Sequence, residues 1–550
     1  MREATLREKL AQASVALVLI VPLLAAFQET HGLADATGTW QPPDAGAQHA
    51  RQMALLFAGL HSLGLGLLSA LLALLIGVPA GWALARPRRP LWLLVIVALP
   101  LALPASVAVS GWVKLCAPGA VSTFAMPYTA SVAGISGLLF STCGAAMVLA
   151  AGLWPIVAFE TWPAFKQIRN ESFDAALLSG SRARAFFKIA LPQAKGELAA
   201  GALLVFLLAA SDFSVSSLLL VRTLPVEIHD ALISGKTASA AWASLPLLCM
   251  AAAFSLMLAK LAGRPREQLH GTAAPTLISQ NESSKAPVLA LALLAGGILL
   301  GFVVPLAACM LGAFSGGQPM SRIYGLGSES LGITLRLAGA AAVISLLAGM
   351  ARLIAWPETR ARALNAAGLF FLAIPGSFLA AGLLAVQNAG VGWARALNAE
   401  VLGAVLPAAV LALGYTLRFI YLPMRLVEEG LSALDPDLLD AAALAGHGRL
   451  SRAVSIAFPL VLSHLAAGMA LVFILSLGEI PIADKLHSPG VTPATIWLFQ
   501  QQHLGYDESV FGLSLLLGGM AAGALFAAGL AAALFMKLFQ RVQTNGFELT

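Results

Sequence analysis

The 550-residue sequence contains little charge: only 11% of its residues are Asp, Glu, Lys or Arg, whereas 59% are hydrophobic. Soluble domains carry about 25% charged residues, so this composition excludes a soluble globular protein. The sequence also contains no G-x-x-x-x-G-K-(S/T) segment. That absence excludes a phosphate-binding loop for ATP of this type within the chain.

Cysteine is scarce too, and its spacing excludes a disulfide framework or a C-x-x-C metal site. The four cysteines lie in or beside apolar segments, where they fit as small core residues: Cys116, Cys143, Cys249 and Cys309. The histidines show no metal-ligand spacing, and no nucleophile stands in a recognisable arrangement with a base. We therefore predict no metal site and no catalytic residue, and we do not expect an enzyme.

Long apolar runs dominate what is present. Windows of about 20 apolar residues recur, and each can cross a bilayer core of about 30 Å. The sequence predicts an all-α polytopic membrane protein with about twelve spans, the first a signal-anchor, at residues 10–27, 54–85, 91–112, 134–158, 198–221, 239–262, 287–312, 331–354, 364–387, 401–424, 463–484 and 510–536.

The distribution of Lys and Arg predicts the orientation, because cytoplasmic loops concentrate these residues. One side of the predicted topology holds 25 of the 33, namely the segments 1–9, 86–90, 159–197, 260–286, 351–363, 418–462 and 537–550. We therefore expect both termini in the cytoplasm. The Arg-Pro-Arg-Arg-Pro segment at 86–90 is then a tight cytoplasmic turn, and no nucleic-acid partner is expected.

Two polar segments repeat one pattern. Residues 171–192 read ESFDAALLSGSRARAFFKIALP, and residues 437–459 read DLLDAAALAGHGRLSRAVSIAFP. Each contains Asp-Ala-Ala, a Gly six residues after the Asp, and a closing Ile-Ala-(Leu/Phe)-Pro. Six predicted spans separate the copies, so both face the same side and the halves are parallel repeats.

This pattern resembles the EAA coupling loop of ABC-importer permeases, with Asp in place of the leading Glu. The second copy has the family spacing, whereas the first is one residue short between Gly180 and Ile189. The resemblance implies two six-helix repeats of the methionine-importer-like permease fold. It divides the chain into a first transmembrane domain (1–262), a cytoplasmic linker (263–286) and a second transmembrane domain (287–550).

By this resemblance, each loop docks a short helix into one of two copies of a cytoplasmic ABC ATPase, which would hold ATP and Mg. Asp suits a helix N-terminus, alanines allow close approach, and glycine permits the positive φ of a turn. The coupling residues are Asp174, Ala175, Ala176, Gly180, Arg182, Arg184 and Pro192 in the first loop, and Asp440, Ala441, Ala442, Gly446, Arg449, Arg452 and Pro459 in the second.

Two acids repeat as well. Asp212 follows Pro192 by 20 residues, and Glu479 follows Pro459 by the same interval. A charge within an apolar span costs about 2.5–3.5 kcal/mol on insertion scales, so both side chains should face the protein interior. One interpretation places them on the translocation path, and the other makes them structural carboxylates that cap or bond a neighbouring helix. Kinks at Pro100, Pro104 and Pro375 have the same two interpretations.

The function that follows is the permease subunit of a binding-protein-dependent ABC importer in a bacterial inner membrane. The fused two-times-six layout and the SLGEIP segment resemble permeases for ferric iron and thiamine, while polyamine-type systems share the loop. No predicted outer loop is long enough for a receptor domain, so a separate periplasmic binding protein is expected. A proton- or sodium-coupled secondary transporter is the main alternative, since it commonly has twelve spans in parallel halves. A membrane-embedded enzyme is the other alternative, but the sequence lacks the clustered His, Asp or Cys residues that such an enzyme needs.

Overall fold

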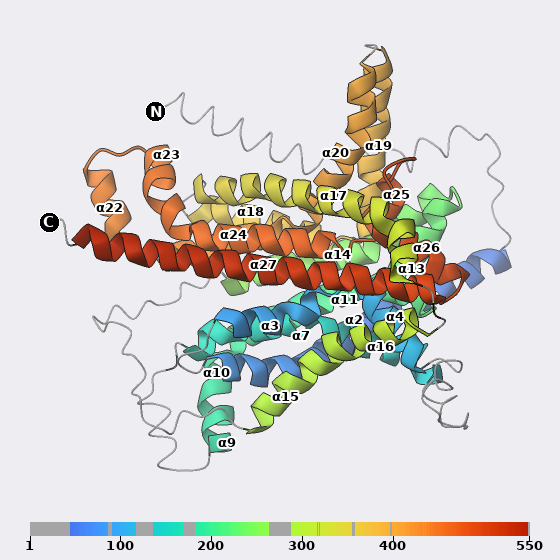
Figure 1. Ribbon diagram of the computed structural model, residues 1–550, viewed down its shortest axis with the longest axis horizontal. Coiled ribbons are helices and arrows are strands. Elements are labelled where there is room, and N and C mark those ends of the chain that lie inside the picture. The colour runs from blue at the N-terminus through green and yellow to red at the C-terminus, as the bar shows by residue number, and fades with distance from the viewer. Residues whose placement is uncertain are drawn as a thin grey trace. The chain divides into compact units, whose positions relative to one another are not determined.

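The computed structural model is almost entirely helical (Figure 1). It describes residues 45–85, 91–116, 136–166, 168, 182–262, 288–315, 317, 319–354, 358–396, 399–432, 434 and 436–547. Within these ranges the only β-type pairing is an isolated bridge between Ser488 and Val491. The predicted first span at 10–27 and the predicted linker at 263–286 lie outside the described residues.

The first sequence repeat contributes eleven described elements: α2 (Ala45–Leu84), α3 (Leu91–Ala102), α4 (Ala105–Cys116), α7 (Thr142–Lys166), α9 (Arg182–Ala185), η2 (Phe186–Ala190), α10 (Leu191–Gln193), α11 (Lys195–Ala210), α12 (Ser214–Leu218), α13 (Leu224–Ile233) and α14 (Thr237–Ala262). The symbol η marks a π-helix, in which the backbone turn is one residue wider than in an α-helix.

The second repeat contributes α15 (Val288–Ile298), η4 (Leu299–Val303), α16 (Val304–Ala313), α17 (Met320–Ile354), α18 (Glu358–Ala373), α19 (Gly376–Ala396), α20 (Glu400–Phe419), α21 (Tyr421–Ser432), α22 (Pro436–Leu444), α23 (Arg449–Arg452), η5 (Ala453–Ala457), α24 (Phe458–Ser476), α25 (Pro481–Leu486), α26 (Ala494–Leu504) and α27 (Glu508–Phe547).

The polytopic helical prediction is confirmed. In the described part of the chain, 7 helices are long and apolar enough to cross a membrane, or up to 11 if each bent helix pair forms one span. Each of these 11 overlaps one of the predicted spans that lie within the described residues. Several bounds differ, because helices continue beyond the apolar run: the span predicted to begin at 463 begins at Leu450 instead.

Paired breaks interrupt equivalent spans of the two repeats. The axis bends by 75° between α3 and α4, where Pro104 lies, and by 107° between α18 and α19, where Pro375 lies. Each proline carbonyl accepts hydrogen bonds from the N–H groups three and four residues later, which starts the next helix. The predicted kinks at Pro104 and Pro375 are confirmed, whereas Pro100 lies inside the continuous α3.

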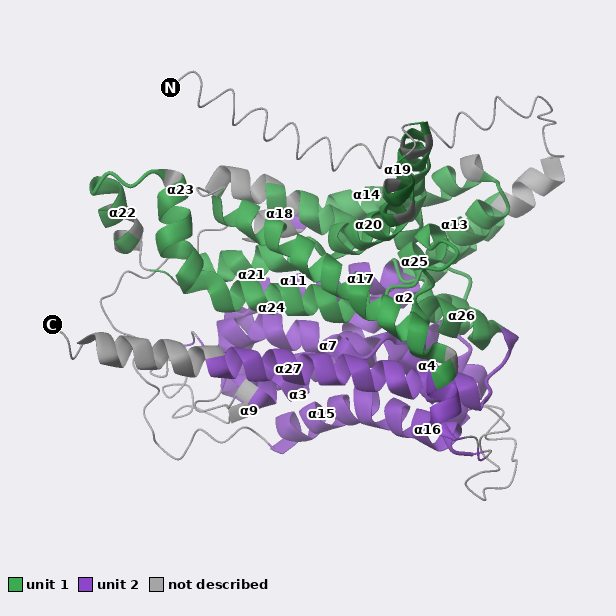
Figure 2. Ribbon diagram, turned by 45° about the horizontal axis from the view of Figure 1, so that its top comes forward, with its two compact units in different colours: residues 1–62, 211–255, 325–503 green, residues 63–210, 256–324, 504–550 purple. Residues whose placement is uncertain are grey.

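Contacts divide the chain into two compact units, and each unit combines segments of both sequence repeats (Figure 2). Unit 1 comprises residues 1–62, 211–255 and 325–503, and unit 2 comprises residues 63–210, 256–324 and 504–550. The units are defined by contacts, whereas the predicted domains are defined by the sequence repeat. The domain bounds at 262 and 287 therefore stay a prediction.

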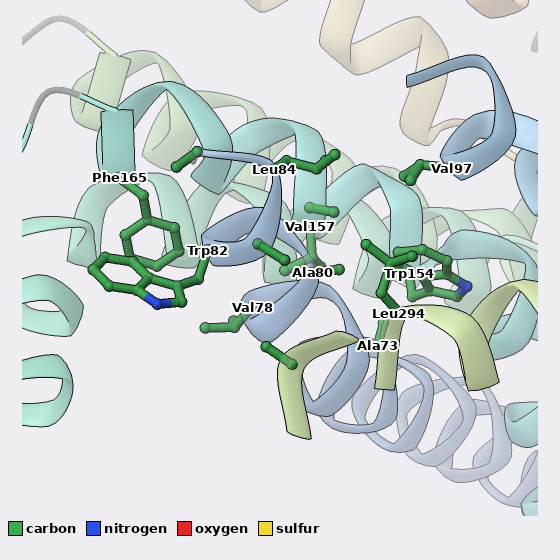
Figure 3. Packing of buried hydrophobic residues seen from close by; sticks show 14 of the residues in the cluster. Ala73, Val78, Ala80, Trp82, Leu84, Val97, Trp154, Val157, Phe165 and Leu294 are labelled. Atoms are coloured by element: carbon green, nitrogen blue, oxygen red, sulfur yellow. The ribbon is translucent and has the colours of Figure 1, made fainter. Parts of the chain in front are cut away.

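The core of unit 2 shows how its helices approach one another (Figure 3). Trp82 on α2 packs edge-to-face on Phe165 of α7, with ring centroids 5.3 Å apart. A Cβ atom at Gly77 would come within 2.6 Å of Val157. Small residues at such positions let helix backbones pack closely in a membrane.

Candidate functional site

The second coupling loop (437–459) begins with the helix α22 and then turns at Gly446, as the sequence predicts. The C-terminal end of α22 is closed by two backbone hydrogen bonds: His447 donates to the Ala442 carbonyl over 3.1 Å, and Gly446 donates to the Ala443 carbonyl over 3.0 Å. Gly446 has φ +85°, a left-handed conformation that favours glycine. This is a Schellman turn, and it directs the chain away from α22 into α23. The predicted turn at Gly446 is confirmed.

The exposed side chains of α22 include apolar ones, both small and large. Ala441 is exposed, and Leu444 at the end of the helix is 90% exposed. Leu438 on α22 and Leu450 on α23 add further exposed apolar side chains. Figure 1 shows α22 and α23 as a hairpin that precedes α24. Exposed apolar groups gathered on a protruding element are typical of a surface that contacts a partner. The side chains of Asp440 and Arg449 lie outside the described residues.

The loop continues into α24 through a π-helix. In η5 the N–H of Phe458 donates to the Ala453 carbonyl, five residues earlier. Pro459 is the second residue of α24, directly after the π-helix. Arg452, at the end of α23, is partly buried, whereas Pro459 is exposed.

The first coupling loop (171–192) has the same ending. Its leading residues Asp174, Ala175, Ala176 and Gly180 lie outside the described residues. From α9 onward the elements follow the second loop in a constant register, since α9 and η2 precede α23 and η5 by 267 residues. The side chain of Arg182 is not described, Arg184 is exposed on α9, and Pro192 is exposed on α10.

The two loops differ in what comes after the proline. Beyond α10 the helix axis bends by 69° before α11, whereas Leu450–Ser476 forms one unbroken span. The bend occurs in the sequence Gln193-Ala194-Lys195-Gly196, which is polar and contains glycine. The sequence of the second loop has apolar Leu460, Val461 and Leu462 in this place.

Asp212 and Glu479 each lie just beyond the end of a membrane helix. The sequence placed them inside apolar helices, and this is corrected: α11 ends at Ala210 and α24 ends at Ser476. Both acids then begin a short second helix. The Asp212 carboxylate accepts hydrogen bonds from the N–H groups of Val215, at 2.8 Å, and Ser216, at 3.3 Å.

Glu479 caps the equivalent helix of the second repeat. Its carboxylate accepts a hydrogen bond from the N–H of Ile482 in α25. The side chain is 8% exposed, and its Oε1 atom has no hydrogen-bond partner among the described residues. These hydrogen bonds from backbone N–H groups therefore fit the structural interpretation, in which each acid caps a helix. Their place on a translocation path stays a prediction.

Arg418 brings the two acids into one cluster. This residue near the end of α20 is 6% exposed and interacts electrostatically with both Glu479 and Asp212. Its Nη1 donates to the carbonyl of Ile374, directly before the Pro375 break. The sequence analysis counted Arg418 among the cytoplasmic loop charges, and the structure corrects this. A lone arginine at the end of an apolar run, in LGYTLRFIY, was the available signal.

A second polar cluster, missed by the sequence analysis, lies on short helices that are not candidate spans. The His229 ring on α13 lies 4.2 Å from the Phe213 ring, centroid to centroid, and its Nδ1 lies 3.8 Å from an Asp484 oxygen. Phe213 also contacts Phe499, with ring centroids 5.6 Å apart. Burial, with the nearby positive charge of Lys485, lowers the pKa of His229 to about 4. The imidazole is therefore neutral at pH 7.

No group of three or more His, Cys, Asp or Glu side chains suited to a metal ion occurs in the described part of the chain. What the described residues offer is an exposed apolar surface on α22 and α23 and a buried group of charged side chains. The rest of the first loop, including its Asp-Ala-Ala, stays a prediction.

Residues 341–545 match the family described as binding-protein-dependent transport system inner membrane component. This segment contains the second coupling loop, Arg418 and Glu479. The chain is also similar to the thiamine transport system permease protein ThiP of Escherichia coli (strain K12). The two are 26% identical over 481 residues, which is 82% of this chain and 84% of ThiP. That length exceeds either repeat, so the similarity extends over parts of both.

Proposed function

We propose that this chain is an inner membrane component of a binding-protein-dependent importer, and that it moves thiamine or a thiamine-like solute across the membrane. The similarity to ThiP over 82% of the chain carries the choice of solute. Thiamine is favoured over ferric iron, the other solute class suggested by the sequence, because the similar protein is a thiamine transport system permease.

Coupling to ATP hydrolysis is proposed at the two coupling loops. The second presents an apolar hairpin whose turn is fixed by Gly446. The first repeats the same helix, π-helix and proline in register. Two such loops would each engage one copy of a cytoplasmic ATPase, which would carry ATP and Mg. Docking two copies lets one closing motion of the ATPase pair act on both repeats at once.

The experiment is uptake of radiolabelled thiamine into proteoliposomes. The purified chain is reconstituted with a candidate ATPase and a candidate binding protein from the same organism, with ATP inside the vesicles. We expect uptake that needs the binding protein and internal ATP and that vanadate stops. Uptake driven by a proton or sodium gradient without ATP would instead establish a secondary transporter. Vanadate-sensitive uptake of ferric iron but not thiamine would retain the importer and reject the solute.

Orientation is a further part of the proposal. Cysteines placed in the predicted linker 263–286 should resist a membrane-impermeant thiol reagent in intact cells, whereas cysteines in the segment 28–53 should react. Reaction of the linker from outside would move both coupling loops to the wrong side for a cytoplasmic ATPase.

A further inference from the structure

Helices α19 and α20 form a hairpin that leaves the other helices of unit 1 sideways. The helix axis turns by 107° between α18 and α19, and by 48° between α20 and α21. Figures 1 and 2 both show the α19–α20 hairpin projecting across the direction of α18 and α24, which belong to the same unit. The hairpin therefore runs along the plane of a membrane that α18 and α24 cross.

The lengths of α18 and α21 give the depth at which the hairpin leaves. With a rise of 1.5 Å per residue, the 16 residues of α18 extend about 24 Å from the predicted cytoplasmic segment 351–363. The 12 residues of α21, which ends shortly before the second coupling loop, extend about 18 Å. A bilayer core is about 30 Å thick. On the predicted orientation, the hairpin thus emerges in the outer half of the bilayer.

The exposed surface of the α19–α20 hairpin is apolar. Its exposed large side chains are Val386, Trp393, Val401 and Val405. Trp393 is 72% exposed and Val401 is 80% exposed. Among the described side chains of residues 386–409, only Asn388 and Glu400 are both polar and exposed. A helix surrounded by water carries charged and polar residues on its outer face, so this surface fits apolar surroundings.

The remaining faces of the α19–α20 hairpin are occupied by protein. The two helices pack closely on each other, because a Cβ atom at Gly390 would clash with Leu406. At the base of the hairpin, a Cβ atom at Gly376 would lie 2.8 Å from Pro481 of α25. Helices bond their backbone polar groups internally, which is the condition for placing a chain segment in lipid. The hairpin therefore meets this condition without a further protein partner.

We propose that the α19–α20 hairpin is embedded in the outer boundary of the lipid bilayer, parallel to its plane. Acyl chains would cover the exposed valines, and headgroups would surround Trp393 and Glu400. Tryptophan is enriched at this boundary because its ring is apolar and its N–H is polar. The predicted spans at 364–387 and 401–424 then cross the bilayer only through α18 and α21. Since the base of the hairpin packs on α25, lipid holds that short helix in place.

A fluorescent probe that senses its surroundings tests this placement in the full chain. Cys116, Cys143 and Cys249 are replaced by alanine, and the buried Cys309 is kept. A nitrobenzoxadiazole group is then attached at Val401→Cys on α20 or at Ala389→Cys on α19, both exposed positions. The chain is placed in vesicles of phosphatidylethanolamine and phosphatidylglycerol. Their acyl chains carry bromine, a quencher, either near the headgroup or near the chain end.

Two positions in the same background serve as controls. Leu75, 65% exposed on α2, lies within a candidate span, and Leu444, 90% exposed, lies in the second coupling loop. We expect shallow bromine to quench both hairpin probes at least about twofold more than deep bromine, as for a segment at the boundary between headgroups and acyl chains. A probe at Leu75→Cys should show the reverse order, and one at Leu444→Cys should respond mainly to aqueous iodide.

Three results would overturn the proposal. Iodide quenching as strong as at Leu444 would place the hairpin in water. Stronger quenching by deep bromine would make it cross the bilayer core. Protection from every quencher would mean that a second copy of the chain covers it. If one labelled hairpin variant does not fold, the other decides. The test uses neither a solute nor an ATPase, so its result is independent of the proposed transport function.

Discussion

The two repeats agree in backbone geometry and disagree in side-chain chemistry. Both end the coupling loop in a π-helix and a proline, both break a span at a proline, and both cap a short helix with an acid that follows a membrane helix. Arg418 has no basic counterpart on α7 at the register of 267, where Ala151 lies. The comparison indicates that the two repeats share their backbone architecture, whereas the buried arginine occurs in only one of them and the angle of the proline break differs between them.

The largest effect is expected from replacing the glycines of the two coupling loops, which differ in spacing. Gly446→Arg puts a long side chain at φ +85°, which costs roughly 1–2 kcal/mol, and places a charge on an apolar docking surface. We expect the stimulation of ATP hydrolysis by the loaded binding protein to fall at least about tenfold, a loss of about 1.4 kcal/mol or more. Gly180→Arg, in the loop that is one residue short, should have a smaller effect.

The control for this prediction is Gly446→Asn, because Asn tolerates the left-handed conformation and adds no charge. It should retain most of the stimulation and keep the ATPase bound during purification. Full stimulation in both Arg variants would show that these loops do not couple the ATPase.

The pH dependence of stability should come from one repeat. His229 on α13 corresponds to Phe499 on α26, if Leu224 and Ala494 are matched. The pKa of His229 is about 4 in the folded protein and about 6.5 when unfolded. Both forms are neutral above pH 6.5. As the pH falls from 6.5 to 4, only the unfolded form takes up the proton, so stability is lost, by about 3 kcal/mol in total.

His229→Phe makes the first repeat resemble the second and should remove this loss. The measurement is thermal unfolding of the detergent-purified protein at pH 7.5 and pH 4.5. His447→Gln, at an exposed site in the second coupling loop, is the control and should leave the pH dependence as in the wild type. The same loss of stability at low pH in His229→Phe would show that another group is responsible.

Of the two proline breaks, the sharper one at Pro375 should tolerate a larger side chain less well. Gly376 follows Pro375, and a Cβ there would lie 2.8 Å from Pro481 and 3.0 Å from the Glu479 oxygen. Ala105 holds the equivalent place after Pro104. Gly376→Ala therefore overpacks the site and should destabilise the protein by about 1–3 kcal/mol. The reverse change, Ala105→Gly, should cost at most about 1 kcal/mol.

Melting temperatures of the two variants in the same detergent measure this difference. A smaller decrease for Gly376→Ala than for Ala105→Gly would show that the close approach around Glu479 yields easily.

The smallest expected effect is the loss of a helix cap, and it should be equal in the two repeats. Ser62 accepts from the N–H of Leu224 at 2.9 Å, and Thr334 accepts from the N–H of Ala494 at 2.8 Å, so a neighbouring helix caps α13 and α26 alike. Loss of a helix cap costs about 1 kcal/mol. Ser62→Ala and Thr334→Val should each lower the free energy of unfolding by this amount in urea titrations. A difference of more than about twofold between them would show that the two caps are not equivalent.

The sequence determined what local chemistry can specify. Apolar runs gave the spans, because a bilayer requires about 20 apolar residues of helix. The spacing of the Asp-Ala-Ala, Gly and Pro positions predicted the repeated loops, and the positive φ of Gly446 followed because glycine adopts it without the strain that most other residues meet. Paired prolines predicted the two breaks, since proline cannot donate the hydrogen bond that continues a helix.

The tertiary structure decided what depends on residues far apart in the chain. No local pattern shows that Arg418 interacts with both Asp212 and Glu479, because 206 residues separate Arg418 from Asp212 and only the fold brings them near each other. Nor does the repeat predict that helices of both halves share each compact unit. A charge gains or loses its partner through long-range packing, and in low dielectric that partner decides its energy. The local elements therefore followed from the sequence, whereas the neighbours of Arg418 depend on the tertiary packing.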